Sequence, residues 1–380
     1  MAALAVQSML DLSEIPLVDQ HCHGVVAGPV DRSGFEQMLT ESKDPLPHGG
    51  SWFDTQLGLA VRAQCPPLLG LRPHASAQDY LARRAELSVE ELHQRLFCST
   101  GISDYLVDTG LDGGLLRPSD IAAVSGGRAH EIVRLESIAE QVTRTGTSAG
   151  GFAAAFTEAL GDVTRSAVGL KSIVAYRHGL DLDPARPSAD EVRTAAGRWL
   201  AEFDATGDVR LTDPVLLRHL LWTGLDTGLP LQLHTGFGDP DLTLNRSDPA
   251  LLTRFLRATQ PTAGAVILLH CYPYHRNAAF LAHVFPHVYV DVGLTVNFVG
   301  HRAGAVLAET LEVAPFAKVL FSTDAYGLPE LYAVGAALFR KHLQRVLTGW
   351  VGEDVCTLAD AERIAGMISG GNARQLYRLA

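Results

Sequence analysis

The chain lacks several features that would assign it to a common class of protein. It has only five cysteines among 380 residues, widely spread and with no CxxC pair, so neither a disulfide framework nor a thiolate zinc site is indicated. Its 31 Lys and Arg are outnumbered by 42 Asp and Glu, and the net charge of -11 argues against a sequence-independent grip on nucleic acid. We therefore expect reduced thiols and no nucleic-acid partner.

Long apolar runs are also missing. No stretch approaches the ~20 residues that span a bilayer. The start, MAALAVQSML, has neither the basic segment nor the sustained apolar segment of a signal peptide. These absences predict a soluble, cytoplasmic protein without a membrane partner. Hydrophobic residues make up 47% of the chain, enough for a large core in two average domains or in one large α/β barrel.

Eight short apolar runs have the composition of buried strands. They lie at 17–23, 102–110, 129–137, 166–176, 229–237, 265–272, 287–294 and 318–325. Between most of them, segments such as 190–207, 213–228 and 248–260 repeat apolar residues at spacings of three and four, as helices packed on a sheet do. Strand followed by helix eight times over predicts an α/β fold, a closed parallel (β/α)8 TIM barrel formed by residues 1–380 as a single domain.

Local signals mark where some helices begin and end. Asp213-Pro214 and Asp248-Pro249 are typical of an N-cap followed by proline at the first helical position, and Gly228 is typical of a helix stop. The closing segment, 360–379, is predicted to be helical, with Gly370-Gly371-Asn372 as a turn that could join two short helices.

One region, residues 24–98, breaks the alternation of strand and helix. It is far longer than a single crossover and contains helical pieces around 33–42, 52–63, 76–86 and 88–97. We interpret it as a mostly helical insertion over the barrel mouth. An independent N-terminal domain is the weaker alternative, because a strand that the barrel needs precedes it.

The first run, LVDQHCH, ends in a His-x-His pair. Alternate residues of a strand project to the same face, so His21 and His23 can point to one site while Cys22 faces the surrounding helices, as does Cys271 after the sixth run. Further polar residues lie late in other runs: Lys171, His234, His270 and Asp324. Because catalytic groups of such barrels gather at the carboxyl ends of the strands, we expect these side chains to share one site.

On this layout the chain resembles the amidohydrolase superfamily of metal-dependent hydrolases. Within it, the chain is similar to the amidohydrolase-like region of FluG and nodulin-type glutamine synthetase fusions. The stretches that carry the closer resemblance are GLKSIVAYRHGL (169–180), LHTGFGDPDLTL (233–244), LLHCYPYHRNAAFLAHVFPHVYVDVGL (268–294) and VLFSTDAYGLPE (319–330). Together with the first strand, the resemblance spans most of the chain.

The chemistry of these side chains fits a divalent metal, with zinc the expected ion. Neutral imidazoles and carboxylates are suitable ligands, and the candidate set is His21, His23, His234 and Asp324. A bound metal lowers the pKa of water to about 7, which makes a nucleophile available at neutral pH. For Asp324 the resemblance implies a double role, binding the metal and taking the proton of the attacking water. The alternative for Asp324 is a helix N-cap.

Two residues decide how many metals are bound. The resemblance implies that His270 either binds a second metal or polarises the substrate carbonyl as a catalytic group; the alternative is a structural histidine. Lys171 is costly to bury as an ammonium. It is interpreted as a carboxylated lysine that bridges two metals, with a salt-bridged barrel lysine or a binder of a substrate carboxylate as alternatives. One or two ions are therefore expected.

Substrate recognition is predicted for Tyr176 and Arg177 after the fourth run and for Arg276 after the sixth. Arginine suits carboxylates, which indicates an acidic group on the substrate. The alternative is that both arginines are loop residues paired with Asp239 or Asp241. The remaining histidines near these loops, His178, His275 and His301, are interpreted as exposed loop residues.

Together these features predict an enzyme, a metal-dependent hydrolase that cleaves a C–N bond of amide type in a small, carboxylate-bearing molecule. Similar barrels also catalyse non-oxidative decarboxylation, which is the alternative reaction. A metal-stabilised binding or assembly protein with little turnover is the alternative from another class, since the matching region of the fusions accompanies a glutamine synthetase module. Similar barrels often form homodimers, so a homo-oligomer is a further expectation.

Overall fold

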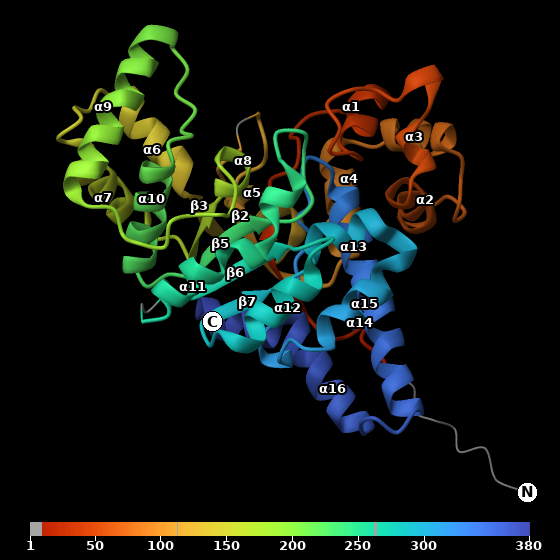
Figure 1. Cartoon of the computed structure of the whole chain (residues 1–380). Coiled ribbons are helices and arrows are strands. Elements are labelled where there is room, and N and C mark those ends of the chain that lie inside the picture. Colours follow the sequence, from red (N-terminus) through yellow and green to blue (C-terminus); the bar gives the residue numbers. More distant parts are fainter. Residues whose placement is uncertain (1–9, 112, 262–263) are drawn as a thin grey trace, which may run out of the picture.

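The computed structural model describes residues 10–111, 113–261 and 264–380. Seven strands form one parallel sheet in which strand order follows the sequence, from β1 to β7 (Figure 1). Their bounds are β1 Leu17–Cys22, β2 Ile102–Asp108, β3 Arg128–Arg134, β4 Gly169–Ser172, β5 Leu231–Thr235, β6 Val266–His270 and β7 Val288–Val290. The first seven predicted runs each contain one of these strands, so the α/β class is confirmed.

The prediction of a regular eighth strand at 318–325 is wrong. Backbone hydrogen bonds nevertheless join this segment to both ends of the sheet. The N–H of Leu320 donates to the carbonyl of the last residue of β7 at 2.9 Å, and the N–H of His23, just past β1, donates to the carbonyl of Ala325 at 2.8 Å. Asp324 has a φ of 50°, a left-handed conformation that interrupts an extended strand.

Helices surround the curled sheet. In Figure 1, α6, α7, α9 and α10 gather at the left of the view and α1–α4 with α13–α15 at the right. The bounds are α1 Arg32–Gln37, α2 Gln56–Leu68, α3 Ala77–Ala85, α4 Val89–Cys98, α5 Pro118–Ser125, α6 Leu135–Arg144, α7 Phe152–Val163, α8 Val174–Arg177, α9 Ala189–Thr206, α10 Pro214–Asp226, α11 Thr253–Thr259, α12 His275–Val284, α13 Gly293–Val299, α14 Ala303–Leu311, α15 Pro329–Gly352, α16 Leu358–Gly366 and α17 Asn372–Tyr377. The predicted strands 129–137 and 166–176 extend too far. Their last residues are helical, because α6 begins directly after β3 and α8 follows β4 within two residues.

The predicted helix ends are confirmed. The Asp213 carboxylate accepts hydrogen bonds from backbone N–H groups at the start of α10, and Asp248 caps a short 3-10 helix, Pro249–Leu252, that leads into α11. Gly228 has a φ of 73°, as a residue past a helix end requires.

The predicted turn at Gly370-Gly371-Asn372 is wrong. Residues Met367–Gly371 form a π-helix that joins α16 to α17 without a turn. A Cβ on Gly370 would lie 3.0 Å from Cγ2 of Val18, so a residue without a side chain allows this segment to approach β1 closely.

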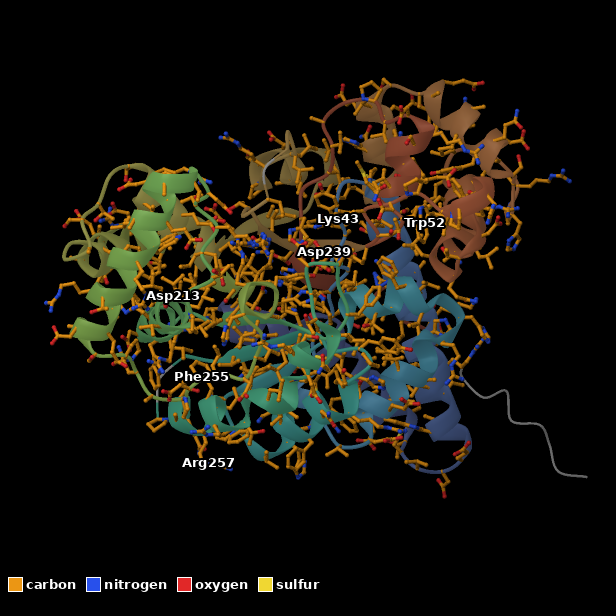
Figure 2. The ribbon with its side chains drawn as sticks, turned by 45° about the horizontal axis from the view of Figure 1, so that its top comes forward. Lys43, Trp52, Asp213, Asp239, Phe255 and Arg257 are labelled. Carbon is orange, nitrogen blue, oxygen red and sulfur yellow. The ribbon has the colours of Figure 1, made fainter. Side chains whose placement is uncertain are left out.

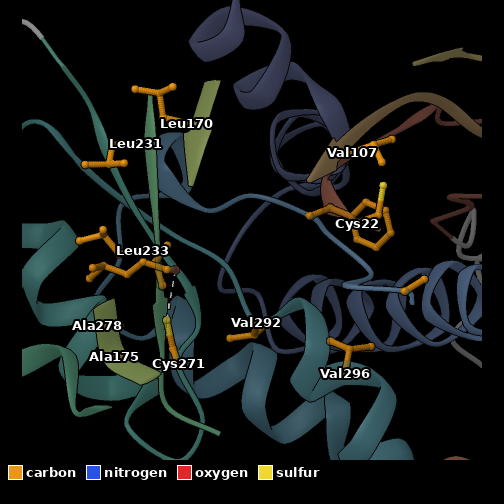
Figure 3. Packing of buried hydrophobic residues seen from close by; sticks show 14 of the residues in the cluster. Cys22, Val107, Leu170, Ala175, Leu231, Leu233, Cys271, Ala278, Val292 and Val296 are labelled. Atoms are coloured by element: carbon orange, nitrogen blue, oxygen red, sulfur yellow. Dashed lines mark hydrogen bonds between the residues drawn. The ribbon is translucent and has the colours of Figure 1, made fainter. Parts of the chain in front are cut away.

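The buried side chains separate into a large cluster and a small one. The small cluster consists of Val18, Leu106, Ile132, Ile267, Leu269, Leu320, Ala373 and Tyr377. Cys22 and Cys271 belong to the large cluster, which includes most buried helix residues, and Figure 3 shows Cys22 near Val107 and Cys271 near Leu233. The prediction that both thiols face the helices is confirmed.

No helix in the described part of the chain is long and apolar enough to cross a membrane. The expectation that the first ten residues carry no signal peptide concerns a stretch of which residues 1–9 lie outside the described residues. Helices α1–α4 occupy the 24–98 region, as the sequence predicted; its role as a lid stays a prediction.

Candidate active site

A cavity of about 720 Å³ opens where the strands end. Its wall includes all six residues predicted as ligands or catalytic groups: His21, His23, Lys171, His234, His270 and Asp324. These residues come from β1, β4, β5, β6 and the segment after β7, or lie directly beyond them. Parallel strands present their carboxyl ends at the same edge of a sheet, which is why residues far apart in sequence share this cavity.

A bulge in β1 sets the direction of His21. Pairing between β1 and β2 passes from Asp19–Tyr105 to Cys22–Val107, so three steps along β1 oppose two along β2. Gln20 and His21 are adjacent in sequence, yet both contact Gln232. Strict alternation along the strand would have placed these two side chains on opposite faces.

Gln232 fixes the tautomer of His21. Its amide nitrogen donates to the carbonyl of Gln20 at 2.6 Å and to the hydroxyl of Tyr377 at 2.9 Å, which leaves its carbonyl oxygen as an acceptor 2.8 Å from Nδ1 of His21. Nδ1 therefore carries the proton, and Nε2 presents a lone pair to the cavity.

The same surroundings keep His21 neutral. Burial and the nearby Lys171 ammonium lower the pKa of His21 to about 4. A neutral imidazole with a fixed lone pair is the form that binds a metal. Sequence reasoning missed Gln232, although a single amide within the apolar run LPLQLHTGF was a signal for it.

Asp324 is the point on which the histidines converge. Its Oδ1 lies 3.1 Å from Nε2 of His21 and 3.3 Å from Nε2 of His23, and its Oδ2 lies 3.7 Å from Nδ1 of His270. Among the described residues, neither this Oδ1 nor this Nδ1 has a well-formed hydrogen bond, although both are buried. Ligand atoms of His21, His270 and Asp324 lie within 4.8 Å of one another. Lone pairs gathered in this way suit a cation between them.

The alternative that Asp324 caps a helix is wrong, because the next helix, α15, begins at Pro329 with Leu328 at its cap. Asp324 and His270 both have left-handed backbones, with φ of 50° and 67°. Such conformations cost about 1–3 kcal/mol each and are concentrated at functional sites.

Asp291, which sequence reasoning missed, supports the His270 backbone. Its carboxylate accepts hydrogen bonds from the N–H of His270 at 2.8 Å and from the hydroxyl of Ser322 at 2.8 Å. Burial raises the pKa of Asp291. The signal for it was an aspartate directly after the apolar run VYV.

Lys171 lies beside His21, with Nζ 3.3 Å from Nε2. Burial lowers the pKa of Lys171 to about 8, while the carboxylates of Asp108 and Asp324 oppose this shift. No described carboxylate forms an ion pair with the ammonium, so the salt-bridged alternative has no partner here. The lowered pKa makes the neutral amine, the form that can be carboxylated, more accessible.

His234 lies in the cavity wall next to His270, with ring centroids 4.6 Å apart. Its Nε2 is 3.1 Å from the carbonyl of Phe237, and the ring of Tyr176 lies 4.4 Å away. The described ligand groups that meet within 4.8 Å do not include His234. Its place in the metal site therefore remains a proposal.

Two further site residues were missed by sequence reasoning. Asp108 ends β2 and joins His21 and His23 in a second group of potential ligand atoms within 4.8 Å. Arg134, the last residue of β3, bonds Asp108 Oδ2 at 2.6 Å and lines the cavity. Burial tends to raise the pKa of Asp108, but Arg134 and the histidines hold it well below its usual value. Their positions late in predicted strands were the available signal.

The predicted substrate-binding residues divide into two kinds. Tyr176 and Arg177 lie on α8 and line the cavity. Arg177 pairs with Glu140 at 2.8 Å, so the alternative was right that this arginine has a protein partner and wrong about which one. Arg276 is 60% exposed, pairs with Glu312 at 3.1 Å and is absent from the cavity wall. The structure does not bring Arg276 to the site, because α12 directs it toward the outer helices.

The other histidines differ from expectation at two positions, His275 and His178. His275 is buried and lies 2.7 Å from Glu309, so the interpretation as an exposed loop residue is wrong. It is the first residue of α12 rather than part of a loop. His301 is exposed, as predicted, and His178 is partly buried.

Known proteins are similar to this chain in sequence and in fold. A family model described as amidohydrolase matches residues 164–379, more than half of the chain. The chain belongs to the amidohydrolase family. It is 28% identical over 410 aligned positions to the protein fluG of Emericella nidulans; the match covers 96% of this chain and 46% of that protein. The chain thus spans about half the length of this curated relative.

Solved structures agree with the family. A putative metal-dependent hydrolase from Lactobacillus casei has a TM-score of 0.84 and 29% identity, covering 97% of this chain and 98% of that one. A uronate isomerase from Bacillus halodurans has a TM-score of 0.65 at 14% identity, covering 97% and 94%, and shows a shared fold alone. The amidohydrolase family and its metal-dependent member imply a divalent metal, and the converging donors at Asp324 fit one.

Proposed function

We propose that this amidohydrolase cleaves a C–N bond of amide type in a small molecule. The observation that carries the proposal is the buried Oδ1 of Asp324, which faces two imidazole nitrogens without a well-formed hydrogen bond. Such a donor set in a cavity of about 720 Å³ leaves room for both an ion and a substrate.

The ion would be held by His21, His23 and Asp324, with His234 and Lys171 as further ligands. When bound, a divalent ion such as zinc would polarise the substrate carbonyl and make a nucleophile available from water at neutral pH. Asp324 would accept the proton of the attacking water and deliver it to the leaving nitrogen. His270 at the end of β6 is the candidate to stabilise charge on the carbonyl oxygen.

We also propose a closed eight-membered barrel as the scaffold. The hydrogen bonds from segment 320–325 to β7 and β1 support it, as does the TM-score of 0.84 to a metal-dependent hydrolase. Residues 24–98 would then form a lid over the mouth, since Gln37, Thr40 and Leu57 line the same cavity as the histidines.

Elemental analysis tests the metal site. Purified wild type is compared with His21→Ala, His234→Ala and Lys171→Ala, with His301→Ala as an exposed control. Two ions per chain that fall in Lys171→Ala would indicate a carboxylated lysine bridge. One ion, lost in His21→Ala and kept in Lys171→Ala, would leave His270 as a catalytic group. Wild type that binds no metal even after reconstitution would exclude this function.

The reaction itself is tested by product analysis on the metal-loaded enzyme. Release of an amine and a carboxylate from an amide supports hydrolysis. Release of carbon dioxide from an aromatic or other carboxylic acid would favour the decarboxylase instead. Unfolding of His21→Ala, with no turnover of any substrate by the loaded wild type, would favour a metal-stabilised binding protein.

A further inference from the structure

A second cavity adjoins the one that holds the histidines. It has a volume of about 530 Å³, and its wall is largely apolar, including Leu39, Trp52, Phe237, Leu242 and Phe298. The two cavities share the wall residues Thr40, Glu41, Ser42, Leu57, Asp239 and Phe298. The two cavities therefore lie next to each other along this shared wall.

The apolar cavity is built from fixed side chains. The ring centroids of Phe237 and Phe298 are 5.1 Å apart. Trp52 is anchored through its backbone, whose N–H donates to the Glu36 carboxylate at 2.8 Å, and the Ser51 hydroxyl donates to the same carboxylate at 2.8 Å. Rigid aromatic walls of this kind suit an apolar substituent such as a phenyl ring.

The shared wall has two carboxylates without a cationic partner. Among the described residues, neither Glu41 nor Asp239 forms an ion pair, and Asp239 accepts only the backbone N–H of Asp241 in a local turn. Most cations nearby are paired with other carboxylates: Arg134 with Asp108, Arg177 with Glu140, and both Lys43 and Arg210 with Asp241, at 2.6 and 3.5 Å. Lys171, which also lines the wall, lies beside His21 instead. Figure 2 shows Lys43, from the 24–98 region, near Asp239, from the loop after β5, in the middle of the molecule.

Glu41 and Asp239 are therefore two carboxyl groups without a cationic partner where the two cavities meet. Burial and the carboxylates of Asp324 and Asp239 raise the pKa of Glu41 to about 7, so its ionised form is disfavoured until a positive charge approaches. At the inner end of the same cavity, the buried Nδ1 of His270 also lacks a hydrogen-bond partner among the described residues. Both observations indicate a ligand that spans the cavity.

We propose that the substrate is an amide whose distal part carries a protonated amine, held between Glu41 and Asp239, and an apolar group seated among Trp52, Phe237 and Phe298. This inference rests on the proposed hydrolase function and replaces the carboxylate that the sequence predicted. The cavity arginines Arg134, Arg177 and Arg210 cannot bind a carboxylate without giving up Asp108, Glu140 or Asp241. An ammonium, in contrast, meets two carboxyl groups that have no cationic partner.

Binding of three phenyl-bearing probes tests the proposal. Phenethylamine, phenethyl alcohol and hydrocinnamate share a phenyl group and a short chain and differ in charge. Calorimetry with metal-loaded protein should show phenethylamine binding about tenfold or more tighter than the alcohol, with hydrocinnamate weakest. Tightest binding of hydrocinnamate, or equal binding of all three, would overturn the proposal.

Substitutions in the walls of the two cavities test where phenethylamine binds. Glu41→Gln should reduce phenethylamine affinity about tenfold and leave the alcohol unchanged, while Trp52→Ala should weaken both. The exposed Glu353→Gln is the matched control and should change neither. An amine affinity that Glu41→Gln and Asp239→Asn both leave at the wild-type value, with folding verified by circular dichroism, refutes the assignment.

Different results would contradict the proposed hydrolysis and the proposed amine ligand. Tight amine binding without hydrolysis of any amide would contradict the proposed reaction but support the ligand assignment. Hydrolysis of amides with an acidic distal group, together with no amine binding, would support the reaction but contradict the assignment of an amine-bearing substrate.

Discussion

Replacing Gln232 by methionine should weaken metal binding without touching a proposed ligand. The change preserves length and volume but removes the oxygen that accepts the Nδ1–H of His21 at 2.8 Å. His21 can then adopt the other tautomer, which carries its proton on the nitrogen that faces Asp324. Loss of such a supporting hydrogen bond costs about 10–100-fold in metal affinity, or about 1.4–2.7 kcal/mol.

The same substitution also has a stability cost that must be separated from the metal effect. The amide of Gln232 donates to the carbonyl of Gln20 and to the hydroxyl of Tyr377, and loss of a buried partner costs about 1–3 kcal/mol. Tyr377→Phe is the matched control. It removes one contact of the same amide but leaves its oxygen on His21, so it should lower stability by about 1 kcal/mol and keep the metal affinity.

The assay is a titration of metal-free protein in competition with a chromogenic chelator, using the ion found in the purified protein. Urea denaturation of each metal-free variant gives its free energy of unfolding. The tautomer argument is refuted if Gln232→Met binds the ion as tightly as wild type. It is also refuted if Tyr377→Phe loses as much affinity as Gln232→Met.

Three further predictions concern the rest of the molecule. Arg84→Met should lower the free energy of unfolding by about 3–5 kcal/mol, because it leaves the buried Glu330 carboxylate without the guanidinium 2.7 Å away; a urea midpoint equal to that of wild type would contradict this. In the folded protein a thiol reagent should label Cys98 first, since it is the exposed cysteine, and prior labelling of Cys22 would contradict the burial described above. The pKa of Glu41, raised from 4.5 to about 7 by burial and neighbouring carboxylates, makes its ionised form destabilising. Wild type should therefore lose stability relative to Glu41→Gln as pH rises from 4.5 through 7, by up to about 3 kcal/mol, with no difference below pH 4.5; a pH-independent difference in urea unfolding would refute this.

Much of the fold was predictable from local pattern. Seven of the eight apolar runs contain strands, and caps such as Asp213 form as expected, because burial and capping depend on neighbouring residues in the chain. The failures occur where distant contacts override local preference. Segment 318–325 follows a 3-10 helix that ends at Lys318, and it pairs with β7 only through an isolated bridge at Val319. The Gly370 region stays helical where it packs against Val18.

The sequence by itself determined which side chains gather at the candidate site. Histidines, an aspartate and a lysine late in apolar runs had to meet, since parallel strands share one carboxyl edge. No pattern in the chain could show which partners those side chains would take. The bulge in β1, the orientation of His21 by Gln232 and the pairing of Arg177 with Glu140 join residues from separate strands and helices.

The charge of the substrate site was decided in the same way. From sequence, two arginines indicated a carboxylate. In the structure their guanidinium groups are bonded to glutamates, and Glu41 and Asp239 line the cavity without an ion pair among the described residues. Ion pairing depends on distances of a few ångströms between segments far apart in the chain, so only the tertiary structure could assign it.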